Sequence, residues 1–188
     1  KRQLIICFGS MSRWAPLGLP GRRLAARKAA LDRQLEEDGE PIVEGARVLD
    51  LFAGTGQLGI EALSRGAQRA VFVDRRTDAV KLIRENLALT RLEEGAQVVC
   101  GDSMVYLNAL REKFDLIFLD PPYADDLLER AVAHIARFDI LAADGIMIAE
   151  SPAEKELPKL SAPYRVAREY RYGRIKVTLY RRDGEETT

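Results

Sequence analysis

The stretch Arg47-Val48-Leu49-Asp50-Leu51-Phe52-Ala53-Gly54-Thr55-Gly56 decides the fold of this 188-residue chain. Its first six residues form a short, mostly apolar run, which is typical of a buried parallel strand. Glycines follow at positions 54, 56 and 59, and Ile60-Glu61-Ala62-Leu63 then indicates a helix. A strand, a glycine-rich turn and a helix predict the start of a βαβ unit, where a nucleotide cofactor can approach the backbone at a helix N-terminus.

The acids at the ends of the first two strands narrow the choice of cofactor. A carboxylate at Asp50 would repel a pyrophosphate but suits a cationic ligand that carries an amino acid, such as S-adenosylmethionine. A capping role for Asp50 is the alternative. Asp74 ends a strand predicted over 69–74, at the distance from the glycine loop where an acid typically accepts hydrogen bonds from ribose hydroxyls. Asp74 could also cap the helix that begins near Thr77.

A third strand, predicted over 96–100, leads into Gly101-Asp102-Ser103. An acid at this place could receive the amine of an adenine ring. Asp102 or Ser103 could equally cap the helix that follows, which is predicted to run through Leu110.

The second informative motif is Asp120-Pro121-Pro122-Tyr123, which follows the apolar strand Asp115-Leu116-Ile117-Phe118-Leu119. An aryl amine or amide nitrogen is a poor nucleophile because its lone pair is delocalised. The Asp120 carboxylate and the Pro121 carbonyl can accept hydrogen bonds from such an NH2 group and favour the charge that develops during attack on a sulfonium methyl. The prolines stiffen the turn, and Tyr123 offers a flat face for stacking a base taken out of its helix. The two motifs together predict a nitrogen methyltransferase.

The chain resembles the bacterial RsmD-type methyltransferases, which methylate the N2 amine of a guanine in small-subunit ribosomal RNA. The residues that carry the resemblance are 48–56, the more specific stretch 58–67 (Leu-Gly-Ile-Glu-Ala-Leu-Ser-Arg-Gly-Ala), the motif 120–123 and the late pair Tyr172-Gly173. It spans about residues 45–182. The resemblance implies that the cofactor is S-adenosylmethionine and that Asp120, Pro121, Pro122 and Tyr123 hold the guanine. Together with the loop and the cap positions, the expected cofactor contacts are Asp50, Phe52, Ala53, Gly54, Gly56, Asp74, Asp102 and Ser103.

The N-terminus departs from the family pattern. Members usually carry a Thr-Arg-Pro-Thr element and then a helix rich in Arg, Glu and Phe, which helps to cover the cofactor and to meet the RNA. In this chain the corresponding residues 19–31 (Leu-Pro-Gly-Arg-Arg-Leu-Ala-Ala-Arg-Lys-Ala-Ala-Leu) lack that element. The departure concerns RNA affinity and specificity more than cofactor binding.

The order of the predicted elements gives the fold class. Strands expected over 47–52, 69–74, 96–100, 115–119 and 145–150 alternate with helices, and a closing strand pair is expected over 164–171 and 174–180. This order predicts an α/β Rossmann-like methyltransferase fold, with a mostly parallel seven-stranded sheet, one antiparallel strand and helices on both faces. We expect residues 1–44 to form an RNA-facing strand and basic helix, 45–182 the methyltransferase domain, and 183–188 a flexible tail.

Composition and charge agree with this expectation. The chain is 47% hydrophobic and 31% charged, which is ordinary for a globular protein, and no apolar run is long enough to span a membrane. The two cysteines, Cys7 and Cys100, have no metal-site spacing and form no disulfide framework, so we expect no metal and a reducing, cytoplasmic location. We also expect a monomer. The only histidine, His134, is expected to be structural or solvated.

The net charge of zero hides a concentration of basic residues at both ends of the chain. At the C-terminal end these are Arg165, Arg168, Arg171, Arg174, Lys176, Arg181 and Arg182. They could form a phosphate-binding surface around the site, or they could simply be solvated faces of strands.

Three functions compete at this point. The leading one is methylation of guanine N2 in ribosomal RNA. Another nitrogen methyltransferase, acting on adenine N6 in DNA or RNA or on a protein glutamine amide, is the second. The third is a noncatalytic RNA-binding scaffold with this fold.

Overall fold

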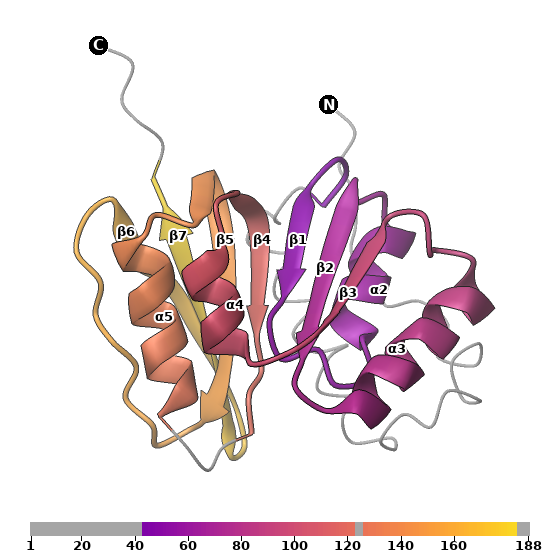
Figure 1. Ribbon diagram of the computed structural model, residues 1–188. Coiled ribbons are helices and arrows are strands. Elements are labelled where there is room, and N and C mark those ends of the chain that lie inside the picture. The colour runs from indigo at the N-terminus through magenta and orange to yellow at the C-terminus, as the bar shows by residue number, and fades with distance from the viewer. Residues whose placement is uncertain (1–42, 123–125, 184–188) are drawn as a thin grey trace. The chain divides into compact units, whose positions relative to one another are not determined.

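A computed structural model of the chain describes residues 43–122 and 126–183 (Figure 1). The elements of this part follow one another in the order β1 (Arg47–Asp50), α2 (Gln57–Ser64), β2 (Arg69–Asp74), α3 (Thr77–Thr90), β3 (Ala96–Cys100), α4 (Ser103–Ala109), β4 (Phe114–Leu119), α5 (Leu127–Arg137), β5 (Leu141–Pro152), β6 (Tyr164–Tyr172) and β7 (Ile175–Arg182). The strand and basic helix expected before residue 43, and the tail expected from residue 184, lie outside the described residues.

The seven strands form one sheet in the order β3-β2-β1-β4-β5-β7-β6. Strands β1 to β5 run parallel, and β7 pairs antiparallel with both β5 and β6. The predicted fold class, with one antiparallel strand, is therefore confirmed. Because β1 pairs with β2 on one side and with β4 on the other, the strand order reverses at β1. Ligands of open α/β sheets bind at the carboxyl ends of the strands at such a reversal.

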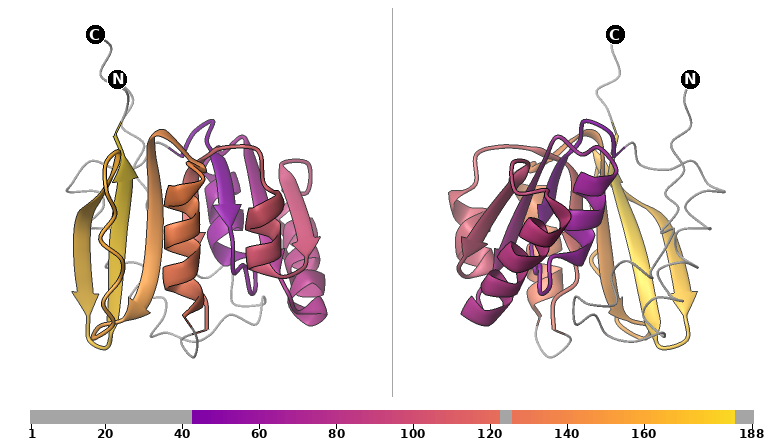
Figure 2. Two further views of the ribbon diagram at one scale, coloured as in Figure 1. Left: turned by 60° about the vertical axis from the view of Figure 1, so that its left-hand side comes forward. Right: turned by 90° about the vertical axis from the view of Figure 1, so that its right-hand side faces the viewer.

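Alternating side chains of the strands divide the apolar interior between the two faces of the sheet. Leu49 and Val71 point to the face that carries α4 and α5, where they join Ile135 of α5 in one buried cluster. Phe72 points to the opposite face and contacts Gly59 of α2 so closely that a methyl group on Gly59 would lie 2.3 Å from its ring. Helices α4 and α5 lie in front of the sheet in Figure 1, and Figure 2 shows that both faces carry helices.

Two differences from the predicted strand bounds have a clear physical reason. The first strand was expected to reach Phe52, but β1 ends at Asp50, where its pairing with β2 and β4 stops and the glycine loop leaves the sheet. The fifth was expected to begin at residue 145, but β5 begins at Leu141. The strand continues through an irregularity in its pairing with β4, where Asp144 adopts a left-handed conformation with φ of 61°. An Asp-Gly pair that suggests a turn is therefore part of a bulged strand.

Ion pairs join the strands at the amino-terminal edge of the parallel sheet. Arg47 of β1 binds Asp115 of β4, with 3.1 Å between Nε and Oδ2. Asp139, which precedes β5, accepts hydrogen bonds from Arg182 Nε at 2.6 Å and from the Tyr164 hydroxyl at 2.9 Å, and it also binds Lys113. The Arg182 guanidinium, joined by Lys113 and Tyr164, holds the pKa of the Asp139 carboxyl well below its usual range. These contacts fasten the β6–β7 hairpin to the core.

Within residues 43–122 and 126–183, no helix is long and apolar enough to cross a lipid bilayer.

Candidate active site

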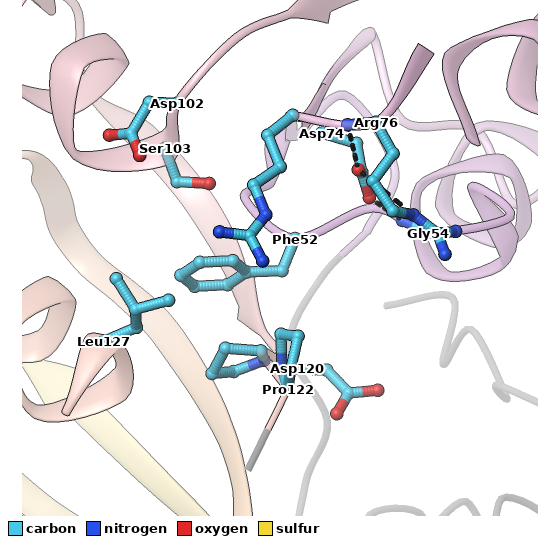
Figure 3. Close-up of a pocket in the computed structure, with 11 residues that line it drawn as sticks. Phe52, Gly54, Asp74, Arg76, Asp102, Ser103, Asp120, Pro122 and Leu127 are labelled. Atoms are coloured by element: carbon cyan, nitrogen blue, oxygen red, sulfur yellow. Dashed lines mark hydrogen bonds and ion pairs between the residues drawn. The ribbon is translucent and has the colours of Figure 1, made fainter. Parts of the chain in front are cut away.

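A cavity of about 520 Å³ opens at the carboxyl ends of β1, β2, β3 and β4, within the size range of ligand pockets (Figure 3). It contains parts of both sequence motifs, since the loop after β1 and the turn after β4 each contribute to its wall. The lining residues are Phe52, Gly54, Asp74, Arg75, Arg76, Asp102, Ser103, Asp120, Pro121, Pro122 and Leu127. The structure thus brings together eight of the residues that were predicted for the site: Phe52, Gly54, Asp74, Asp102, Ser103, Asp120, Pro121 and Pro122.

Asp74 closes the glycine loop. Its Oδ2 accepts a hydrogen bond of 2.8 Å from the backbone N–H of Gly54, which adopts a left-handed φ of 54°. Its Oδ1 accepts a bond of 2.9 Å from the backbone N–H of Arg76. The alternative role of Asp74 as the cap of the next helix is wrong, because Arg76 occupies the N-cap position of α3 and no side chain caps that helix.

The conformation of the glycine loop is fixed by a tight turn at Gly56 and by a hydrogen bond from Asn86. Gly56 is buried with φ of 77°, and a methyl group there would lie 3.1 Å from Ile83. The Gly56 N–H donates to the Ala53 carbonyl at 2.7 Å, which makes the turn tight. The Asn86 side chain, which is 2% exposed, donates to the Thr55 carbonyl at 2.9 Å. Ala53 and Gly56, predicted to contact the cofactor, therefore shape the loop but are absent from the cavity wall.

Asn86 was missed by the sequence analysis. A signal for it exists, because Asn86 lies on the buried face of α3 with Val80, Ile83 and Leu87. A polar side chain on an apolar helix face needs a hydrogen-bond partner, and here that partner is the loop.

Asp50 is 3% exposed and is also absent from the cavity wall. Its Oδ2 accepts a hydrogen bond of 3.1 Å from the backbone N–H of Gly59, in the first turn of α2. The N-cap residue of α2 is Gly56, which has no side chain to cap the helix. The structure therefore bears out the alternative capping role of Asp50, which it performs from the neighbouring strand, and the acid stabilises the positive end of the helix dipole.

Asp102 and Ser103 form the corner of the cavity at the end of β3. Asp102 caps α4, because its Oδ1 accepts hydrogen bonds from the backbone N–H groups of Met104 at 2.9 Å and Val105 at 3.0 Å. The Ser103 hydroxyl is buried and donates to the Leu51 carbonyl at 2.9 Å, which ties α4 to the end of β1. Both capping bonds end on Oδ1, so the second carboxylate oxygen of Asp102 takes no part in the cap.

The turn after β4 forms the other end of the cavity. Asp120 and Pro122 are exposed, and Pro121 between them is buried. Figure 3 shows the Phe52 ring between the corner of Asp102 and Ser103 and the turn that carries Asp120 and Pro122. Tyr123, the last residue of the motif, lies outside the described residues.

The cavity wall also includes Arg75, Arg76 and Leu127, which the sequence analysis did not select. Arg76 Nε lies 3.9 Å from Asp74 and 3.7 Å from Asp78, so its charge is partly balanced. Arg75 and Arg76 follow directly after Asp74, and this position at the carboxyl end of a strand was the available signal. Leu127 is the first residue of α5, a position without a sequence signal.

The arrangement suits an organic cofactor better than a metal. In residues 43–122 and 126–183, no group of three or more His, Cys, Asp or Glu side chains could hold a metal ion. Three carboxylates, those of Asp74, Asp102 and Asp120, line the cavity together with the Phe52 ring. Carboxylate acceptors and an aromatic surface suit a nucleoside, whose hydroxyl and amine groups donate hydrogen bonds.

The strand order with its single antiparallel strand and the glycine loop beside an Asp-Pro-Pro turn define a class I S-adenosylmethionine-dependent methyltransferase. The model of the family described as conserved hypothetical protein 95 matches residues 26–181. The chain therefore belongs to this family, which is the RsmD family of methyltransferases.

Relatives of known sequence or structure agree with this assignment. Over 147 residues, 77% of this chain and 80% of the relative, it is 40% identical to the putative rRNA methyltransferase YlbH of Bacillus subtilis. It is 32% identical to the ribosomal RNA small subunit methyltransferase D of Escherichia coli over 77% of this chain and 73% of that protein. The solved structure of the putative methyltransferase yhhF from Escherichia coli superposes with a TM-score of 0.75 at 30% identity, covering 89% of each chain.

Proposed function

We propose that this enzyme transfers the methyl group of S-adenosylmethionine to the exocyclic N2 amine of a guanine in small-subunit ribosomal RNA. Membership of the family and the likeness to the Escherichia coli small-subunit enzyme support the RNA substrate. The observation that carries the proposal is the single cavity that the Gly54 loop and the Asp120-Pro121-Pro122 turn share. A cofactor at the first would present its methyl group to a base held at the second.

The nucleoside part of the cofactor would lie along the ends of β1 to β3. Each oxygen of the Asp74 carboxylate already accepts one backbone hydrogen bond and can accept a second from a ribose hydroxyl. The Asp102 carboxylate oxygen that takes no part in the cap would accept a hydrogen bond from the adenine amine. The hydrogen bond from Ser103 to the Leu51 carbonyl would hold this part of the cavity wall in position. The Phe52 ring supplies an apolar surface next to the ring system.

Asp50, Ala53 and Gly56 have a positioning role in this proposal. Asp50 holds the first turn of α2 through Gly59, and Ala53 and Gly56 form the tight turn that brings the Gly54 backbone to the cofactor. The buried Asp50 carboxylate also places a negative charge beneath the loop, which favours a cofactor with a sulfonium and an ammonium group.

The guanine would enter from the exposed side of the turn. Asp120 and the Pro121 carbonyl would accept the two N–H groups of the guanine N2 amine, which directs the nitrogen lone pair at the methyl carbon. When bound, S-adenosylmethionine would supply the methyl group: the C–S bond would break as the N–C bond forms, and the guanine nitrogen would then lose a proton to solvent. Catalysis in this scheme comes from alignment and from acceptors that stabilise the developing positive charge. Tyr123 would stack on the guanine once it has left its helix.

We further propose that residues 1–44 extend the surface that meets the RNA, that 45–182 form the methyltransferase domain and that 183–188 form a tail. A cytoplasmic monomer is the form in which we expect the enzyme to act. These points rest on the sequence and on the substrate proposed above.

The test is transfer of labelled methyl from S-adenosylmethionine to unmethylated small ribosomal subunits, to their naked RNA and to duplex DNA, with nucleoside mass analysis of the product. We expect N2-methylguanosine in ribosomal RNA. Label on adenine N6 would contradict the proposed position of methylation. Binding of the RNA without transfer, and without binding of the cofactor, would favour a scaffold over an enzyme.

The Asp120→Ala variant tests the role of the turn in the same assay. Removing one acceptor should lower kcat by about 100-fold or more, as the loss of one oxyanion-hole donor does elsewhere. S-adenosylhomocysteine affinity, measured by calorimetry, should stay within about twofold of wild type because Asp120 faces the guanine in this proposal. Asp120→Asn, which keeps one oxygen acceptor, is the matched control and should recover part of the rate. Equal loss of cofactor affinity and rate in Asp120→Ala would show that Asp120 is structural.

A further inference from the structure

The basic residues of the last two strands separate into two groups that lie at opposite edges of the sheet. Arg165 and Arg182 lie at the amino-terminal edge, where Arg165 binds Asp183 at 3.0 Å and Arg182 binds Asp139. Arg171 and Arg174 lie at the other end of the hairpin, on either side of the turn at Gly173. The sequence alone left these residues as one group.

The turn of this hairpin lies on the same edge as the candidate active site. Strand β7 pairs with the last residues of β5 through Pro152↔Ile175, and the Ala153 N–H donates to the Arg174 carbonyl at 3.0 Å. Strand β5 in turn pairs with Leu119, the residue before Asp120. Figure 1 shows the β6–β7 turn at the lower edge of the sheet, where β1, β4 and β5 end.

Regular strand geometry gives the separation between the turn and the site. Two steps between neighbouring strands, from β4 through β5 to β7, amount to about 10 Å, and the turn lies a few residues further along the strand direction. Counted from the level of Thr178, the turn is about 13 Å further along the strands than Asp120, so the tip of the hairpin is about 15–20 Å from Asp120. This is within reach of a nucleic acid strand that places one base in the cavity.

The charges at this tip are uncompensated within the part of the chain that the structure describes. Arg171 and Arg174 are exposed, and neither forms an ion pair or a side-chain hydrogen bond with residues 43–122 or 126–183. Lys176, two residues beyond Arg174, contrasts with them, because it is 2% exposed and binds Glu169 at 3.3 Å. Two unpaired guanidinium groups beside the substrate entrance suit an anionic partner, and guanidinium groups bind phosphate oxygens in a bidentate manner.

We propose that Arg171 and Arg174 bind phosphates of the RNA strand that flanks the target guanine. The proposal rests on the proposed function, since it needs an RNA base at Asp120. A guanine taken out of its helix brings the RNA strand that flanks it to the carboxyl edge of the sheet, where the hairpin tip also lies. The arginines would then fix the register of the strand, and base recognition would remain with the turn at 120–122.

The test compares two double variants of equal charge on the same hairpin. Arg171→Ala with Arg174→Ala removes the tip charges, and Arg165→Ala with Arg181→Ala removes two charges at the opposite edge, where Arg165 and Arg181 face each other in the strand pairing. Binding of naked, unmethylated small-subunit ribosomal RNA is measured over a series of salt concentrations. We expect the tip variant to lose about tenfold in affinity at 0.1 M salt and to reduce the salt slope by about 1.4, since each phosphate contact on a single strand contributes about 0.7.

The control variant should keep the wild-type slope, and both variants should bind S-adenosylhomocysteine like wild type. A tip variant with lysine at both positions should keep most of the slope, because lysine also neutralises a phosphate. Equal slopes for the tip and control variants, with RNA still bound by wild type, would overturn this inference and leave the proposed function intact. Absence of wild-type binding both to the naked RNA and to unmethylated small ribosomal subunits would overturn this inference and the proposed function.

Discussion

The two edges of the parallel sheet use acidic residues in different ways. At the amino-terminal edge, carboxylates bind cationic side chains, as Asp115 binds Arg47 and Asp139 binds Arg182 and Lys113. At the carboxyl edge, Asp50, Asp74 and Asp102 accept hydrogen bonds from backbone N–H groups. The first arrangement balances the charge with a side chain. The second orients the carboxylate in a loop or at a helix end.

This difference separates acids of the scaffold from acids of a binding site. A carboxylate that accepts one backbone hydrogen bond per oxygen still has lone pairs for a ligand, and the backbone dipoles balance only part of its charge. Asp74 shows this at the cavity wall, with the exposed Arg76 no nearer than 3.9 Å. The residue type is the same at both edges, so the partner and not the amino acid distinguishes the roles.

The strongest test of this comparison is Asp50→Ala. The change leaves the buried N–H of Gly59 without its acceptor, so the free energy of unfolding should fall by about 2 kcal/mol. S-adenosylhomocysteine affinity should fall by about tenfold, because the loop and the first turn of α2 lose their anchor. Urea unfolding and calorimetry measure the two effects.

Asp50→Asn is the matched variant, since its side-chain oxygen can still accept from Gly59. It should recover most of the stability, and a cofactor affinity that stays low would assign the remaining loss to the missing charge. Unchanged affinity in Asp50→Ala would show that this acid does not serve the site.

Asp139→Ala, at the amino-terminal edge, should lower stability without lowering cofactor affinity. It removes the acceptor of Arg182 and Tyr164, and the Arg182 side chain is only 9% exposed. We expect a loss of about 2 kcal/mol in unfolding free energy, less than for a fully buried pair because Asp139 itself is partly solvated. Cofactor affinity should not change. The exposed Glu94→Ala is a control of equal charge and should stay within about 0.5 kcal/mol of wild type.

The pH dependence of the unfolding free energy also tests the ion pairs at the amino-terminal edge, and the expected change is smaller. Hydrogen bonds from Arg182, with those from Lys113 and Tyr164, lower the folded-state pKa of Asp139 below its unfolded value of 3.8. A lowered pKa stabilises the fold at pH values above the unfolded pKa, and this contribution is lost as the pH falls towards the folded pKa. The difference in unfolding free energy between wild type and Asp139→Ala should therefore be constant from pH 7 to about 5 and shrink between about pH 4 and 2. If this difference in unfolding free energy were the same at pH 2.5 as at pH 7, the prediction would be wrong.

Much of the fold was predictable because its signals are local. The strands over 69–74 and 96–100 and the helix start at Thr77 were predicted at their observed positions, since apolar runs and turn residues mark them. The start of β5 was not, because Asp144-Gly145 is a turn signal and only pairing with β4 draws it into a strand. The extent of β1 was overestimated for the converse reason, since Leu51 and Phe52 look like strand residues but lie beyond the last residue that pairs with β2 and β4.

The sequence by itself determined the order of the elements, the glycine loop, the Asp-Pro-Pro turn and the family, because each is written in neighbouring residues. Only the tertiary structure decided which acid binds which partner. In the folded chain the Asp50 carboxylate accepts a hydrogen bond from Gly59 and does not line the cavity. The Asn86 side chain donates to the glycine loop at Thr55. The tertiary structure also divided the C-terminal arginines between two edges. These outcomes depend on strand order and register, which bring distant residues together, so local sequence does not specify which partner each residue meets.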